Sequence, residues 1–172
     1  MPVDRLCKLL NESHIPYDLV EHFSTYTTAA TGSITHIPGR ELAKPVMVRV
    51  DGAAVMAVVP GSRHLDLKKF KDALGAKSIH VMAEDDFANA FPDCELGAMP
   101  PFGMLYGLPV YVDERLTHEK DIFFNSGSHR ELVRVAYKDF DRIQHPKVLH
   151  IASATAGERL DEDRLIGPYP HL

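Results

Sequence analysis

The sequence has few of the features that would set it apart from an ordinary soluble domain. It contains no tryptophan and only two cysteines, Cys7 and Cys94, which lie far apart and lack a redox or metal-type spacing. Such sparse cysteine use favours a reducing cytoplasm. No segment approaches the roughly 18 consecutive apolar residues that cross a bilayer, and the amino terminus lacks the basic and apolar regions of a signal peptide. We therefore expect a cytoplasmic protein without a membrane partner.

An excess of basic charge is also absent. The chain carries 19 Lys and Arg residues against 24 Asp and Glu residues, a formal net charge of -5. This balance argues against a protein that coats nucleic acid by neutralising phosphates. The sequence also lacks a helix-turn-helix signature, so we do not expect sequence-specific DNA binding. The main basic cluster, which could contact a phosphate backbone or form the solvated face of a helix, is Lys68, Lys69 and Lys71, with Lys77 nearby.

What remains is typical of one globular domain. The 172 residues are 45% hydrophobic and show no internal repeat or low-complexity tract. At this length the core needs no disulfide or structural metal. Elements of both types alternate along the chain, which predicts a single α/β (mixed α+β) domain. We expect the domain to cover residues 1–148, and residues 149–172 to form a C-terminal extension, either an appendage or a partly disordered end.

Hydrophobic periodicity and turn residues place the elements. The firmest local prediction is a hairpin around Asp51-Gly52, because this dipeptide suits a tight two-residue turn. Asp66 can begin a helix as an N-cap, and Gly75 can end it. Strands are predicted over residues 15–21, 45–50, 53–59, 78–82, 109–112, 121–125 and 131–136. Helices are predicted over residues 3–10, 26–36, 67–74, 84–91 and 137–143.

Three segments carry residue types that suit chemistry. They are HIPGRELAK at 36–44, GAMPPFG at 97–103 and FNSGSHREL at 124–132. In order and spacing they resemble the YbaK and prolyl-tRNA-synthetase-associated domain family, in its free-standing aminoacyl-tRNA deacylase subgroup. The resemblance implies a mixed, largely antiparallel curved sheet surrounded by helices. It also implies hydrolysis of wrongly charged aminoacyl-tRNA, often on tRNA for proline. The implied partners are the tRNA acceptor end and an aminoacyl-tRNA synthetase.

Lys44 is the first candidate catalytic residue. It immediately precedes an apolar strand, where its ammonium group can point into a pocket. A positive charge in a low-dielectric pocket could stabilise the oxygen of an attacked ester, or bind the terminal ribose and phosphate of the tRNA. An ordinary lysine whose amine reaches solvent at a strand start is the alternative, and composition alone favours it. The family motif reverses that preference.

The loop that begins at Gly97 fits a Gly-x-x-x-Pro pattern. It resembles the loop that deacylases of this family use to hold the ester. Backbone N–H groups aimed at a developing oxyanion need little reorganisation, and prolines restrict the loop to one shape. A tight structural turn is the alternative. Pro100 and Pro101 cannot donate. The candidate backbone donors are Gly97, Ala98, Met99, Phe102 and Gly103. Of the loop residues, we list Gly97, Ala98 and Met99 as candidate catalytic residues, and Pro101, Phe102 and Gly103 as candidate substrate-binding residues.

The third segment adds Gly127, Ser128 and His129 as candidate substrate-binding residues. The His129 imidazole could orient a water, bind the amino acid, or serve as a structural turn residue. A Ser128 nucleophile is not predicted, because no Gly-x-Ser-x-Gly pattern surrounds it. His36 precedes a Pro-Gly turn and resembles a position of the free-standing subgroup, so it could line the pocket.

Two further features limit the prediction. Pro45 stands where many deacylases have threonine or asparagine, so a side-chain donor is lost and the amino-acid specificity stays open, as it does with Met99 in the loop. The ten histidines show no metal-ligand spacing, and phosphate-loop and dinucleotide fingerprints are missing, so we predict no metal and no cofactor.

These residues and the family resemblance together predict an aminoacyl-tRNA deacylase that edits in trans. Water attacks the ester carbonyl, Lys44 and loop amides stabilise the oxyanion, and the ribose hydroxyl of the substrate assists proton transfer. A non-catalytic tRNA- or synthetase-binding module with the same pocket is the alternative.

Overall fold

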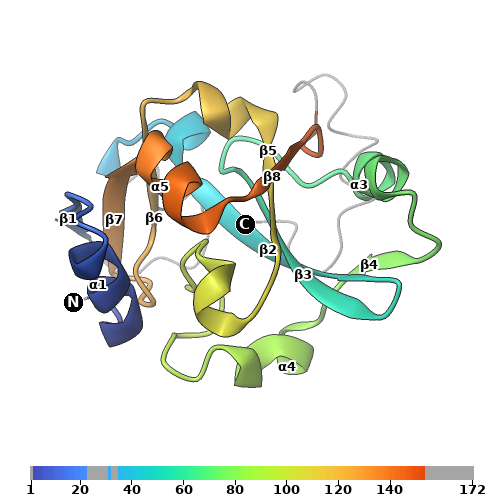
Figure 1. Ribbon diagram of the computed structural model, residues 1–172, viewed down its shortest axis with the longest axis horizontal. Coiled ribbons are helices and arrows are strands. Elements are labelled where there is room, and N and C mark those ends of the chain that lie inside the picture. Colours follow the sequence, from blue (N-terminus) through green and yellow to red (C-terminus); the bar gives the residue numbers. More distant parts are fainter. Residues whose placement is uncertain (1, 23–30, 32–34, 154–172) are drawn as a thin grey trace.

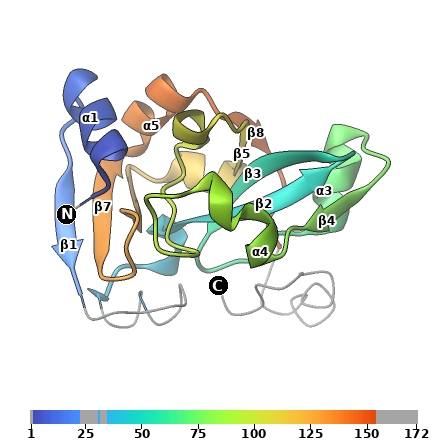
Figure 2. The ribbon, with the colours of Figure 1, turned by 90° about the horizontal axis from the view of Figure 1, so that it is seen from below.

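The computed structural model describes residues 2–22, 31 and 35–153 of the chain. A three-stranded antiparallel sheet, in the order β1-β7-β6, occupies one side of the molecule. Its strands are β1 (Asp18–Glu21), β6 (Asp121–Asn125) and β7 (Glu131–Ala136). Helices α1 (Asp4–Glu12) and α5 (Tyr137–Gln144) lie on the same side of the molecule as this sheet (Figures 1 and 2).

A second sheet of five strands extends to the other side, in the order β4-β2-β3-β5-β8. The strands are β2 (Ala43–Val50), β3 (Ala53–Pro60), β4 (Ile79–Val81), β5 (Val110–Asp113) and β8 (Lys147–Leu149). β5 pairs in parallel with both β3 and β8, and the other pairs are antiparallel. A parallel bridge between Leu42 and Phe123 joins the two sheets. The predicted fold class, a mixed and largely antiparallel α/β domain, is confirmed, with its strands divided between two sheets.

The remaining elements connect and cover these sheets. Helix α3 (Leu67–Leu74) lies beside β4, and helix α4 (Glu84–Phe87) leads into the loop that carries the second motif. Short 3-10 turns complete the chain at η1 (Gly39–Glu41), η2 (Ala88–Ala90), η3 (Gly103–Tyr106) and η4 (Glu114–His118). One hydrophobic core joins α1, α3, α4 and α5 to both sheets, and its largest fully buried side chains include Phe70, Phe102, Phe124 and Phe140.

Several local predictions are confirmed with their physical cause. Asp51 and Gly52 have φ of 48° and 87°, which is the backbone of a two-residue hairpin turn that matches the strand twist. The Asp66 carboxylate accepts a hydrogen bond from the N–H of Lys69 at 3.0 Å and so caps α3. Gly75 ends that helix in the left-handed conformation at φ 61°.

Other predictions differ from the structure in extent. The strand predicted over 15–21 begins only at Asp18, because Ile15 is buried in the core and its N–H closes a turn onto Leu10. The helix predicted over 84–91 is α-helical only to Phe87 and then tightens into a 3-10 turn before Pro92. The helix predicted over 26–36 lies largely outside the described residues.

The chain continues in ordered contact with the domain beyond residue 148. Ile151, Ala152 and Ser153 are buried, and Leu65 forms an antiparallel bridge with Ala152. Residues 149–153 therefore pack against the domain, and residues 154–172 lie outside the described residues. The division of the chain into a domain and an extension stays a prediction.

Within the described residues, no helix combines the length and the apolar character that crossing a membrane requires.

Candidate functional site

Lys44 is the second residue of β2, and its side chain is only 7% exposed. Residues 43–48 of this strand are all buried, so a side chain on either face of the strand enters the interior. The Lys44 Nζ donates a hydrogen bond to the carbonyl oxygen of Arg63 at 3.2 Å. Burial lowers the pKa of the Lys44 amine from 10.5 to about 8, because a charged group loses hydration in the interior. The structure therefore holds an ionisable amine inside the fold rather than in solvent.

The second and third motifs meet through His129. The imidazole Nε2 lies 2.7 Å from the carbonyl oxygen of Leu96, and the His129 N–H donates to a carboxylate oxygen of Glu95 at 3.2 Å. The Glu95 N–H donates in turn to the Gly127 carbonyl at 2.8 Å. His129 is 6% exposed. Of the roles that the sequence left open for His129, these contacts favour a structural one, in which it holds the loop that begins at Glu95.

The loop at Gly97 needs glycine for its backbone. Gly97 has φ of 82°, a conformation that side chains rarely adopt, and a Cβ there would be in ordinary contact with the His129 ring at 3.7 Å. The Ala98 N–H donates to the Glu95 carbonyl at 3.0 Å and closes a tight turn. The Ala98 N–H is thus already engaged within the loop, and its role as a donor to the substrate stays a prediction. The N–H groups of Gly97 and Met99 make no hydrogen bond within the described part of the chain.

Two predicted substrate-binding residues, Phe102 and Gly103, pack tightly into the core. Phe102 is fully buried and packs edge-on against Phe124 and Phe140, with ring centroids 5.6 and 5.2 Å apart. A Cβ on Gly103 would lie 2.6 Å from a methyl carbon of Val110. These residues anchor the loop to the core, and their role as substrate contacts stays a prediction. Pro101 is buried beside them.

The remaining predicted residues lie at the edges of the site. Gly127 has φ of 110°, and a Cβ there would approach Val3 to 2.3 Å, so glycine is required for packing. The Ser128 hydroxyl accepts a hydrogen bond from the Arg130 N–H at 3.1 Å. Ser128 lines an open hollow of about 310 Å³, together with Glu21, His22, Arg130 and Glu131. His36 is exposed, with a left-handed φ of 58°, and lines neither this hollow nor the cavity beside the loop.

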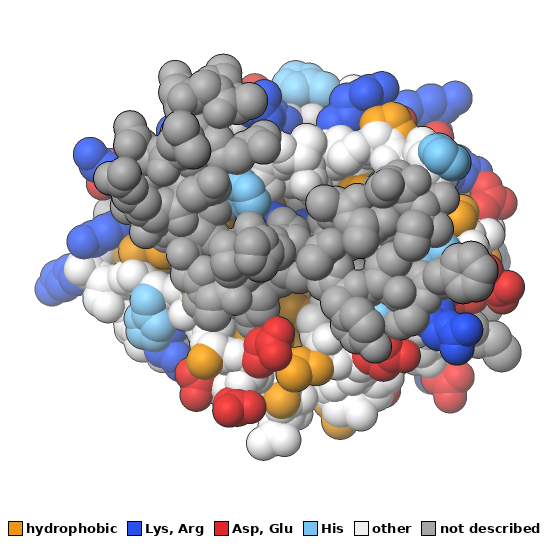
Figure 3. Space-filling view, turned by 180° about the vertical axis from the view of Figure 1, so that it is seen from behind, with side chains coloured by type: hydrophobic (Ala, Val, Ile, Leu, Met, Phe, Trp, Pro, Cys, Tyr) orange, Lys and Arg blue, Asp and Glu red, His pale blue; other side chains and the backbone are white. Residues whose placement is uncertain are grey.

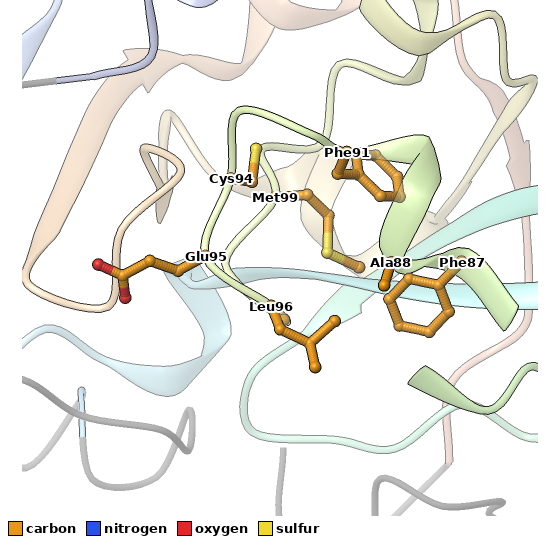
Figure 4. A pocket seen from close by; sticks show the side chains of 8 residues that line it. Phe87, Ala88, Phe91, Cys94, Glu95, Leu96 and Met99 are labelled. Carbon is orange, nitrogen blue, oxygen red and sulfur yellow. The ribbon is translucent and has the colours of Figure 1, made fainter. Parts of the chain in front are cut away.

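A cavity of about 130 Å³ lies beside Gly97 and Met99 (Figure 4). Its other walls come from α4, from η2 and from the segment after η2. The lining residues there are Phe87, Ala88, Phe91, Cys94, Glu95 and Leu96. Phe87 and Phe91 were predicted to lie on a helix, but not to line a site. Their signal was an aromatic pair four residues apart just before the glycine-proline loop, and the two rings do meet edge-on at 6.3 Å.

Cys94 lines this cavity, but its thiol has low reactivity as a nucleophile. Burial raises the pKa of the thiol to about 11, and its Sγ lies 3.3 Å from the hydroxyl of Tyr106. A thiol with a raised pKa holds little of the thiolate that attacks an ester. Cys94 is therefore a weak nucleophile at neutral pH.

β2 and the loop enter the same core. Ala43 and Val46, which lie close to Lys44 along β2, belong to the hydrophobic cluster that also holds Met99 and Phe102.

Among the described residues, no group of three or more His, Cys, Asp or Glu side chains could bind a metal ion. On the face shown in Figure 3, acidic side chains gather along the lower part and basic side chains lie at the margins.

Comparisons with known proteins agree with this architecture. The family model described as "Aminoacyl-tRNA editing domain" matches residues 22–143. A proline–tRNA ligase from Solidesulfovibrio magneticus is 30% identical over 96 residues, which are 56% of this chain and 16% of that protein. The chain thus spans only a small part of that ligase. The Enterococcus faecalis protein named "Putative Cys-tRNA(Pro)/Cys-tRNA(Cys) deacylase EbsC" is 27% identical over 135 residues, 75% of this chain and 80% of that protein.

Solved structures share the fold at lower identity. A crystal structure described as "a putative trans-editing enzyme for prolyl tRNA synthetase" superposes with a TM-score of 0.74 at 21% identity, covering 87% of this chain and 96% of the other. The hypothetical protein APE2540 gives a TM-score of 0.76 at 16% identity, covering 87% and 100%. The family model covers more than half of the sequence, and so the chain belongs to the aminoacyl-tRNA editing domain family.

Proposed function

We propose that this protein hydrolyses the ester bond of a mischarged aminoacyl-tRNA, acting in trans. The observation that carries the proposal is the buried amine of Lys44 in a chain of the editing family. A lysine amine in the interior loses hydration, so folding gains nothing from its charge. An ionisable group that stays buried despite this loss of hydration, with a pKa of about 8, is a candidate for catalysis.

The chemistry needs no side-chain nucleophile. Water attacks the ester carbonyl carbon, and the carbonyl oxygen takes the negative charge of the tetrahedral intermediate. The Lys44 ammonium and the N–H groups of Gly97 and Met99 stabilise that oxyanion. The ribose hydroxyl beside the ester assists transfer of the water proton to the departing ribose oxygen. The ester C–O bond then breaks, which gives a free amino acid and uncharged tRNA.

The cavity beside Gly97 and Met99 takes the side chain of the amino acid. Its volume of about 130 Å³ and its walls of Phe87, Phe91 and Met99 suit a small apolar group. Larger amino acids are rejected by their size. A pocket of this kind discriminates by about 1–3 kcal/mol per methylene, so specificity comes from exclusion. The partner is the acceptor end of a charged tRNA in the cytoplasm, presented free or by an aminoacyl-tRNA synthetase.

A panel of mischarged tRNAs tests the proposal. tRNAs for proline, alanine and cysteine, each charged with several small amino acids, are incubated with and without the protein, and loss of the ester is followed. We expect accelerated loss for at least one small amino acid and none for the larger ones. If the ester is lost at the same rate with and without the protein for every tRNA in the panel, the protein is not a deacylase. The alternative, a tRNA- or synthetase-binding module of the same fold, would then hold.

A further inference from the structure

The segment after β8 reaches back to the residue that binds the Lys44 amine. Ser153 is 2% exposed, and its N–H donates to the His64 carbonyl at 2.7 Å. Its hydroxyl accepts a hydrogen bond from the His64 N–H at 3.1 Å. The guanidinium of Arg63 donates to the Ser153 carbonyl at 2.6 Å. Ser153 thus makes three hydrogen bonds to the turn that follows β3.

One of these bonds acts on the peptide group that faces Lys44. The Arg63 carbonyl and the His64 N–H belong to the same planar peptide unit. In a trans peptide these two groups point in opposite directions, so fixing one direction fixes the other. The Ser153 hydroxyl binds the N–H on one side, and the Lys44 ammonium binds the carbonyl on the other side at 3.2 Å. Each bond also polarises the peptide in the sense that strengthens the other.

The segment that carries Ser153 is itself held firmly. The buried carboxylate of Asp113 accepts hydrogen bonds from the N–H groups of Ile151 and Ala152, both at 2.9 Å. The Ile151 carbonyl accepts a bond from the Asp66 N–H at 2.7 Å. Residues 151–153 lie beyond residues 22–143, which match the editing family. The contact with the Arg63 turn is therefore made by a part of the chain outside the matched region.

From this geometry we infer that Ser153 is a positioning residue, which aims the Arg63 carbonyl and thereby sets the place and the charge of the Lys44 amine. The inference rests on the proposed function for its effect on ester hydrolysis. Its effect on Lys44 itself can be measured without any substrate. None of the three hydrogen bonds of Ser153 is to the Lys44 amine, so its proposed effect on that amine is indirect, through the Arg63–His64 peptide.

The test uses the full chain with Ser153→Ala, and Thr117→Ala as the matched control. Thr117 also makes one side-chain bond to the backbone, to the Glu114 carbonyl at 2.6 Å, in a different part of the molecule. The titration of Lys44 is followed through its Cε shift in lysine-labelled protein, with Lys44→Met to assign the signal. Ser153→Ala should lower the midpoint by about one pH unit, because the charged amine loses a well-aimed acceptor. Thr117→Ala should leave it unchanged.

A rate measurement separates positioning from stability. In Ser153→Ala the alkaline fall of the deacylation rate should move to lower pH by the same amount as the midpoint, whereas a loss of stability alone leaves that limb in place. If Ser153→Ala does not fold, Ser153→Cys keeps a side chain of similar size and leaves every charge in place, but offers the His64 N–H a weaker acceptor, and should shift the midpoint in the same direction by a smaller amount. An unchanged Lys44 midpoint in the folded variant overturns the inference. A shifted midpoint in a protein that hydrolyses no ester overturns the proposed function instead.

Discussion

The amine of Lys44 titrates close to the pH at which cells work. Its pKa of about 8 leaves it mostly protonated at neutral pH, and the charge is lost as the pH rises further. An oxyanion is stabilised by the charged form alone. The protein-dependent rate should therefore fall above about pH 8, while the uncatalysed reaction with hydroxide keeps rising. Single-turnover rates from about pH 6 to about pH 9, corrected for the background, measure this. A corrected rate that rises throughout contradicts the role of the charge.

Lys44 should also lower the stability of the fold at neutral pH. The unfolded amine keeps its proton up to about pH 10.5 and the folded one only to about pH 8, so the unfolded state binds more protons between these values. Stability therefore rises with pH from about 8 to about 10.5, and below pH 8 the full penalty applies. Lys44→Met removes a penalty of up to about 3 kcal/mol and one hydrogen bond worth about 1 kcal/mol.

The predicted result is a gain of about 1–2 kcal/mol for Lys44→Met at pH 7, measured by urea denaturation. The gain should shrink as the pH approaches 10. Lys138→Met on the exposed face of α5 is the control and should change stability by less than about 0.5 kcal/mol. A clear loss of stability in Lys44→Met would show that the amine is there to hold the fold together.

Single residues were predictable from the sequence only where a motif marked them. Lys44 and Gly97 stand in short segments with a recognisable order, and the structure buries the first and gives the second its left-handed backbone. Arg63 and Ser153 carry no such mark. Ser153 lies 90 residues from Arg63 along the chain, and only the folded sheet brings the two together.

The loop between α4 and η3 acts as a unit whose backbone matters more than its side chains. Gly97→Ala places a Cβ at φ of 82° without a steric clash, so the variant should cost about 1–2 kcal/mol of stability and should also lower the deacylation rate. Gly52→Ala is a matched control, because Gly52 has φ of 87° and open space around it. Equal stability losses are expected from denaturation curves, and only Gly97→Ala should slow ester loss. Equal rates for the two variants would remove the loop from the mechanism.

The cavity beside this loop should set the size of the accepted amino acid. Met99 is 3% exposed and forms one wall, so Met99→Ala enlarges the space. Hydrolysis of esters of larger amino acids should rise relative to the small ones by about tenfold or more, given about 1–3 kcal/mol per methylene. Met56→Ala, fully buried in β3 and away from the cavity, should lose stability without this change. An unaltered preference in Met99→Ala would place the side-chain pocket elsewhere.

Elements with a local cause were predicted well, and those with a distant cause were not. The hairpin of β2 and β3 and both ends of α3 follow from turn and capping residues within a few positions. β8 was missed because its three residues owe their conformation to parallel pairing with β5. The division into two sheets was also not predicted, since the Leu42–Phe123 bridge joins segments far apart in the chain.

The charge of the molecule as a whole limits how it can bind tRNA. With a net charge of -5, the protein should contact few phosphates, about two near the acceptor end. The dissociation constant for tRNA should then rise by only about tenfold when salt is raised fourfold. Filter binding at two salt concentrations measures this. Lys68→Ala together with Lys71→Ala on the exposed face of α3 should weaken the salt dependence if that cluster is the contact. A change of about a thousandfold would indicate an extended basic surface instead.

The central claim is that the buried charge of Lys44 drives ester hydrolysis, and one rate tests it most directly. The single-turnover rate of Lys44→Met is compared with that of the wild type at pH 7, on the mischarged tRNA that the wild type hydrolyses fastest. Removing one oxyanion donor costs about 100- to 1,000-fold, and we predict a loss of at least about 100-fold. A folded Lys44→Met protein that hydrolyses the ester at the wild-type rate would contradict the account.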